Sequence, residues 1–161
     1  MGILNDKKYK IKKTQKRKRK RKSKKSILVI SSLIFITNIF TAIYKKDYLY
    51  ATLFSILAVT SLMFHSNKNN KLIMLLDKTA ISLVVFYGGY VFYNLNLQST
   101  IYSHLWRGFI LSTFLFCILV YYYGYIEHKF CFHSNKTIGN QYHAMLHFIG
   151  SIGHHMIILS E

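Results

Sequence analysis

Residues 26–44 read SILVISSLIFITNIFTAIY, an apolar stretch without a charged side chain. A helix needs about 20 predominantly apolar residues to cross the hydrocarbon core of a bilayer. The stretch is too long for the core of a signal peptide, and no small-residue cleavage site follows it. It therefore predicts a retained membrane-spanning helix and places the chain among integral membrane proteins.

Four further apolar segments follow this one. Short polar stretches such as SNKNNK at residues 66–71 separate them, and Trp106 and Arg107 are typical of an interfacial anchor at the head of the fourth span. Alternating barrel-type patterning is absent, so each span is expected to be a helix that satisfies its own backbone. The predicted fold is all-α, a polytopic membrane helical bundle over residues 26–161. About five transmembrane helices are expected, at residues 26–44, 48–65, 72–93, 108–126 and 141–159.

The positive charge of the chain is concentrated before the first span. The formal net charge is +17, and residues 1–25 hold fourteen of the 22 Lys and Arg against one acid, Asp6, which gives this arm +13. A block of like charges repels itself, so the arm is predicted to be disordered in isolation. Three interpretations compete: a clamp on anionic lipid headgroups, a nucleic-acid contact and a nuclear-localisation-like run. The lipid clamp is favoured because the arm directly precedes an apolar span, and nucleic acid is an unlikely partner.

The same charge asymmetry predicts the orientation of the bundle. Basic residues next to the first span favour a cytosolic N-terminus, so spans one, three and five run outward and the other two return. The His65 end of the second span, the Asp77 end of the third and the His143 end of the fifth then lie on the cytosolic side. Ionisable groups that are distant in sequence are thus expected at one depth in one leaflet.

Two histidines near the start of the last span suggest a metal site. His143 and His147 lie in QYHAMLHFIGSIGHH, four residues apart, so a helix stacks them on one face. Imidazole suits zinc, whose catalytic sites take three protein ligands and leave a fourth position open. His154 is predicted on the same face two turns further on, and His155 about 100° away. The pattern is short and common, so histidines packed between helices are an equally open interpretation.

Two other polar residues stand out within the apolar segments. Asp77 is the only acid inside a span, and intramembrane acids usually have a function because burying their charge is costly. The structural alternatives are an ion pair with Lys78 and a hydrogen bond to a helix partner; the ion pair is the weaker, because adjacent residues do not face each other on a helix. Ser61 lies four residues before His65 on one helix face; taken alone, such a serine is usually a packing residue.

Three motifs together resemble the CREST superfamily of membrane hydrolases. This family includes alkaline ceramidases, progestin and adipoQ receptors, hemolysin III proteins and the lipases of GPI-anchor remodelling. The resemblance rests on TSLMFHS with Ser61 and His65, LLDKTAI with Asp77, and QYHAMLHFIGSIG with His143 and His147. The last motif is most similar to the alkaline ceramidase form. The matching regions are about residues 48–93 and 141–159.

The resemblance implies a zinc ion held by His65, His143 and His147, with Asp77 and Ser61 near the water that attacks the substrate. In this interpretation Asp77 is the base and Ser61 donates to the developing oxyanion. The family has seven helices, whereas residues 94–141 of this chain have room for one full span where the family has three. Because one and three are both odd, the last helix keeps its expected orientation. The chain is thus predicted to be a short relative of the seven-helix fold.

The expected function is zinc-dependent hydrolysis of a lipid amide or ester, with membrane lipids as substrates. A non-catalytic zinc-containing receptor or scaffold, and a structural anchor that displays the basic arm, remain open alternatives. Haem ligation by paired histidines is a further alternative that leaves Asp77 unexplained. The sequence indicates neither the lipid nor the organelle, and it leaves a homo-oligomer open.

Overall fold

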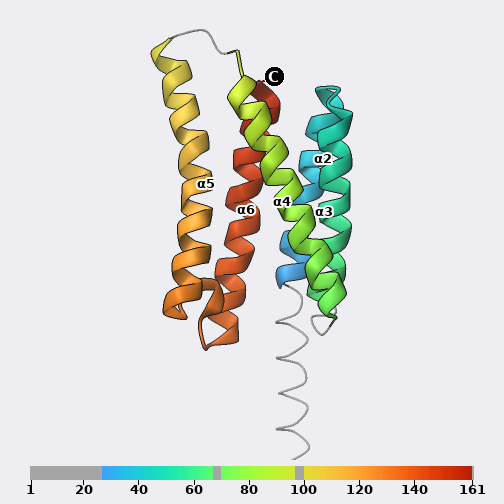
Figure 1. Ribbon diagram of the computed structural model, residues 1–161, viewed down its shortest axis with the longest axis vertical. Coiled ribbons are helices and arrows are strands. Elements are labelled where there is room, and N and C mark those ends of the chain that lie inside the picture. Colours follow the sequence, from blue (N-terminus) through green and yellow to red (C-terminus); the bar gives the residue numbers. More distant parts are fainter. Residues whose placement is uncertain (1–26, 67–69, 97–99, 161) are drawn as a thin grey trace, which may run out of the picture.

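The computed structural model describes residues 27–66, 70–96 and 100–160 (Figure 1). The described residues contain helices and no strand, which confirms the all-α prediction. The first helical segment covers residues 27–32, and a turn at Leu33 and Ile34 separates it from α2. In chain order the following elements are α2 (Phe35–Tyr44), α3 (Tyr48–Ser66), α4 (Lys71–Asn94), α5 (Ile101–Glu127), the short 3₁₀ helix η1 (Phe130–Phe132) and α6 (Lys136–Ser160).

Within the described residues, four segments are long and apolar enough to cross a membrane, and they support a multi-pass membrane protein. They are Ile27–Tyr44, Tyr48–Ser66, Lys71–Asn94 and Ile101–Glu127. The fifth predicted span, residues 141–159, forms most of α6, a helix of 25 residues that is not among these four. Its length is sufficient, but four histidines and several amide, hydroxyl and glycine residues lower its hydropathy.

The two later helices begin earlier than the hydropathy pattern predicts. The fourth span was expected at residues 108–126, whereas α5 begins at Ile101 because Thr100 caps it. The Thr100 hydroxyl accepts a hydrogen bond from the Ser103 amide, and the Ser103 side chain accepts one from the Thr100 amide. This reciprocal capping satisfies amides that the first turn of a helix leaves unpaired. Similarly, α6 begins at Lys136, and Asn135 Oδ1 accepts a hydrogen bond from the Thr137 amide.

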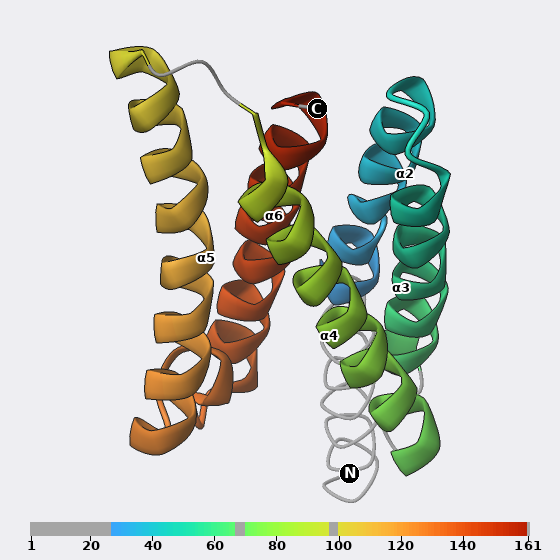
Figure 2. The same cartoon turned by 45° about the horizontal axis from the view of Figure 1, so that its top comes forward.

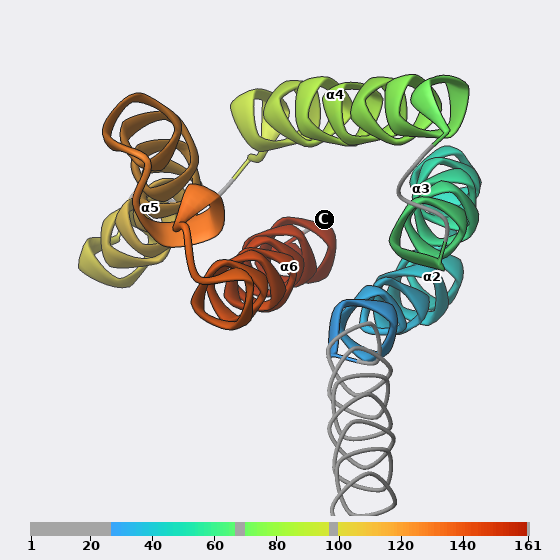
Figure 3. The same cartoon turned by 90° about the horizontal axis from the view of Figure 1, so that it is seen from below.

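The helices run alternately up and down, and α6 lies inside an arc of the others. In Figure 1, α3 ends where α4 and α6 begin, at the lower end of the bundle. Figure 2 shows the same alternation from another side, and Figure 3, looking along the helices, shows α5, α4, α3 and α2 around α6. The position of α6 explains how a more polar helix is accommodated in this bundle, since its histidines face protein instead of lipid.

Large apolar side chains lie both in the core and on the outward faces of the helices, as expected for a bundle embedded in lipid. Every α-helix contributes to the buried core, whose largest fully buried side chains include Tyr50, Phe54, Ile110 and Ile157. Apolar side chains such as Phe86 and Leu119 point outward and are exposed. In a bilayer these outward side chains contact acyl chains, so they need no protein partner.

Candidate metal centre

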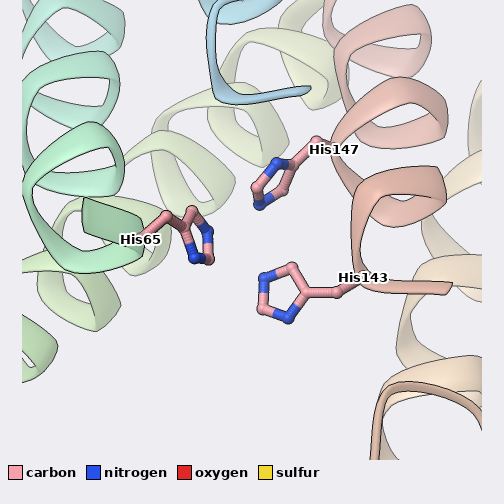
Figure 4. A group of neighbouring side chains, drawn as sticks. All are labelled: His65, His143 and His147. Atoms are coloured by element: carbon pink, nitrogen blue, oxygen red, sulfur yellow. The ribbon is translucent and has the colours of Figure 1, made fainter. Parts of the chain in front are cut away.

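Three histidines from two helices converge at the lower end of the bundle. His65 lies in the last turn of α3, and His143 and His147 lie one turn apart on α6 (Figure 4). Each of the three offers one nitrogen, and these nitrogens all lie within 4.8 Å of one another. The ring centroids are 5.0 Å apart for His65 and His143, 5.2 Å for His65 and His147, and 4.9 Å for His143 and His147.

This arrangement fits the donor set of a zinc site. Zinc–nitrogen bonds of about 2 Å in a tetrahedron leave the ligand nitrogens roughly 3–3.5 Å apart. Side-chain rotations that move each nitrogen by about an ångström would therefore close the observed group around one ion. His65 is 1% exposed and His147 8% exposed, while His143 is half-buried.

Aromatic side chains form part of the wall around the three imidazoles. The Phe35 ring of α2 lies 5.1 Å from the His147 ring, and the Phe64 ring lies 5.1 Å from the His65 ring, centroid to centroid. Such apolar surroundings limit access of solvent and lower the local dielectric constant, which strengthens interactions with a bound cation.

The Ser31 side chain in the first helical segment contacts this group. Ser31 Oγ lies 2.9 Å from Nδ1 of His147 and also donates a hydrogen bond of 3.0 Å to the carbonyl oxygen of Leu28. Metal-ligating histidines usually bind such a partner through the ring nitrogen that does not face the metal. Sequence reasoning missed Ser31, although hydroxyl side chains in the apolar stretch at residues 26–44 were a signal that this helix makes polar contacts inside the bundle.

Ser61, the predicted oxyanion donor, is fully buried on α3 and pairs with a second serine of the first helical segment. Ser61 Oγ lies 3.0 Å from Ser32 Oγ, and Ser32 donates a hydrogen bond of 2.8 Å to the Leu28 carbonyl. Because a hydroxyl has one hydrogen, Ser61 supplies the hydrogen between the two serines whenever Ser32 donates to Leu28. In this geometry Ser61 therefore donates to Ser32.

Asp77, the predicted base, lies in the second turn of α4 at the same end of the bundle, where it is 5% exposed. Thr60, the neighbour of Ser61 on α3, lies beside the Asp77 carboxyl group, and its hydroxyl donates a hydrogen bond of 3.2 Å to the Leu57 carbonyl oxygen. Among the described residues, Asp77 Oδ1 has no hydrogen-bond partner. Asp77 is not one of the three residues whose ligand atoms lie within 4.8 Å of one another.

The other two histidines of α6 lie away from the three-histidine group. His154 is buried, and its Nδ1 forms a hydrogen bond with the Tyr50 hydroxyl. Its ring packs edge-on against the rings of Phe54 and Phe114. Nε2 of His155 lies 2.8 Å from the hydroxyl of Thr37. These contacts assign both residues to packing between α6 and its neighbours.

Comparisons of the chain with protein-family models, with curated proteins and with solved structures found no match.

Proposed function

We propose that this protein is a zinc-dependent membrane hydrolase that cleaves a lipid amide or ester, and that it is a short relative of the CREST superfamily. The observation that carries the proposal is the convergence of His65 from α3 with His143 and His147 from α6. Three imidazoles with room for a fourth ligand are the donor set of a catalytic zinc site. When bound, zinc supplies a Lewis acid that acidifies water and polarises a carbonyl group.

Asp77 is the proposed general base. A base must hold an acceptor atom that the surrounding protein does not occupy, and Oδ1 of Asp77 meets this condition among the described residues. The carboxyl group lies beside Thr60 of α3, the helix that also carries His65. Burying a carboxylate in an apolar segment costs free energy, so an acid at such a position is a functional residue by default.

Ser61 is the proposed oxyanion donor. Donation to a substrate oxygen requires that its hydroxyl turn away from Ser32 Oγ, from which it is 3.0 Å distant. A hydroxyl rotates readily about its carbon–oxygen bond, so this exchange needs no movement of α3. Ser61→Ala should therefore slow turnover without removing a metal ligand.

The proposed substrate is an amphipathic lipid that reaches the centre from one leaflet. His65 lies in the last turn of α3, at the end of the bundle where the headgroup region of a bilayer would be. The apolar side chains of Leu76 and Phe148, which are close in sequence to Asp77 and His147, are exposed. We further propose that this end faces the cytosol. The support is the +13 charge of residues 1–25, which favours a cytosolic N-terminus and attraction to anionic headgroups.

The test separates metal binding from chemistry in the purified full-length chain. Asp77→Asn should keep zinc but lose turnover of a panel of ceramide and ester lipids by about 10²–10⁴-fold, because it removes a base and no ligand. His147→Ala should lose both. Asp47→Asn is the matched control, since Asp47 lies at the other end of α3 and accepts hydrogen bonds from Tyr87.

Two outcomes would replace this function. If Asp77→Asn hydrolysed lipid at the parental rate, the hydrolase would be refuted and a zinc-containing receptor or scaffold would take its place. If the parental chain bound no zinc, the histidines would be packing residues of a structural membrane anchor.

A further inference from the structure

Two adjacent serines in the first helical segment connect it to both helices that carry the proposed zinc ligands. Ser31 contacts His147 of α6, and Ser32 contacts Ser61 of α3. Adjacent residues on a helix point about 100° apart, so one pair of neighbours can reach two different helices. The first segment therefore lies between α3 and α6 and contacts each through a hydroxyl.

The local backbone explains how both serines come to point inward. Their hydroxyls both donate to the carbonyl oxygen of Leu28, at 3.0 Å from Ser31 and 2.8 Å from Ser32. Serine bonds of this kind often bend a helix. The next residues form a tighter turn, in which the Ile34 amide donates to the Ser31 carbonyl at 3.2 Å. Hydrogen bonds within the first helical segment thus orient the Ser31 and Ser32 side chains toward α6 and α3.

Which group donates the hydrogen bond between Ser31 and His147 depends on where the hydrogen of the Ser31 hydroxyl lies. Ser31 Oγ lies 3.0 Å from the Leu28 carbonyl oxygen and 2.9 Å from His147 Nδ1; when its single hydrogen is donated to Leu28, the hydrogen between Ser31 and His147 is supplied by the ring. A neutral imidazole with its hydrogen on Nδ1 carries its lone pair on Nε2. In this tautomer His147 offers Nε2 as the donor atom for a metal.

We propose that Ser31 is a positioning residue of this centre, which holds His147 in the tautomer and ring orientation that aim Nε2 at the metal. This role rests on the proposed zinc site. It gives the first helical segment, which lies outside all three motifs, a function in that site. Outer-shell partners of this kind typically change metal affinity by about 10–100-fold when they are removed.

The test compares three variants of the full-length chain in detergent. Ser31→Ala should bind zinc about 10–100-fold more weakly than the parental chain in competition with a chelator. Ser31→Thr, which keeps the hydroxyl, should restore the affinity. Ser32→Ala is the matched control, because Ser32 is buried, adjacent and bonded to the same carbonyl but contacts Ser61 instead of a histidine. A parental affinity in Ser31→Ala would overturn the role.

A second measurement reads the tautomer directly and needs no metal. Nitrogen-15 NMR of the metal-free parental chain should show His147 protonated at Nδ1, with the signal assigned by its loss in His147→Gln. Ser31→Ala should lose this preference and Ser32→Ala should keep it. A parental His147 protonated at Nε2 would overturn the proposal.

The outcomes also separate this role from the proposed function. Zinc binding without hydrolysis of any lipid would refute the hydrolase and leave the role of Ser31 standing. A parental chain that binds no zinc would overturn both.

Discussion

Asn38 on α2 and Ser151 on α6 hold each other through two hydrogen bonds. Asn38 Nδ2 donates to the Ser151 carbonyl oxygen at 3.0 Å, and the Ser151 hydroxyl donates to Asn38 Oδ1. Both side chains are almost fully buried. Because lipid offers no hydrogen-bond partners, groups placed inside a membrane bundle must be satisfied by the protein. This pair therefore specifies which face of α2 meets α6.

Replacement of Asn38 by Ala should destabilise the bundle by about 1–2 kcal/mol. The change removes both hydrogen bonds and leaves the Ser151 hydroxyl buried without this partner; single side-chain bonds in membrane bundles contribute about 0.6 kcal/mol on average and up to about 1.7. The midpoint of unfolding by a denaturing detergent measures the effect. Thr52→Ala is the control, since Thr52 is exposed and bonds only its own helix, at the Tyr48 carbonyl. Equal midpoints for Asn38→Ala and the control would contradict the assigned contact.

The close approach of α5 to α6 depends on a glycine. A Cβ at Gly153 would collide with the Thr113 hydroxyl of α5 and lie 3.2 Å from the Phe114 ring. Gly153→Ala should therefore destabilise the chain by about 1–3 kcal/mol, as overpacking does. At Gly150, one turn earlier on α6, an added Cβ would meet nothing within 4 Å, so Gly150→Ala should be neutral or slightly stabilising. Thermal unfolding of both variants in one detergent compares them, and similar losses at the two positions would refute the packing argument.

Zinc content should depend on three histidines and be independent of a fourth. His65→Ala, His143→Ala and His147→Ala each remove one proposed ligand and should lower bound zinc from about one ion per chain to a small fraction. His155→Ala should retain zinc, because His155 contacts Thr37 outside the group. Elemental analysis of purified, dialysed protein makes the measurement. Full zinc content in any of the first three variants would remove that residue from the ligand set.

Cysteines placed at the two ends of α5 should react with an impermeant reagent from opposite sides of the membrane. The helix has 27 residues, about 40 Å, which exceeds the hydrocarbon thickness of about 30 Å, so both ends reach the headgroup region. In a chain without Cys117 and Cys131, Glu127→Cys should react with an impermeant maleimide from the cytosolic side. Ile101→Cys should react only from the other side. The reverse labelling pattern would show that the proposed centre faces the compartment opposite the cytosol.

Much of the fold could be predicted because hydropathy reports directly on helices that contact lipid. The spans expected at residues 48–65 and 72–93 agree with α3 and α4 within one residue at each end. The start of α5 was wrong by seven residues, since a helix can extend past the apolar stretch when Thr100 and Ser103 cap it. Hydropathy also gave no sign of the turn at Leu33 and Ile34, which depends on hydrogen bonds within one apolar segment.

The candidate site was predictable to the extent that its residues share a spacing motif. His143 and His147 were expected on one face because they are one helical turn apart, and the alternation of the spans placed His65 at the same end. Ser31 and Thr60 could not be found in this way. Their contacts with His147 and Asp77 depend on the rotation of each helix about its own axis, which follows from packing and not from spacing along the chain.

The polarity of α6 has a consequence for the order of events during membrane assembly. A segment with four histidines gains less on entering lipid than the four helices that precede it, so it partitions poorly on its own. Its entry becomes favourable when α2, α4 and α5 already offer a polar and sterically matched lining. Residues 136–160 are also synthesised after those helices. The entry of α6 is therefore the step that brings His143 and His147 to His65, and chains stalled before it lack the centre.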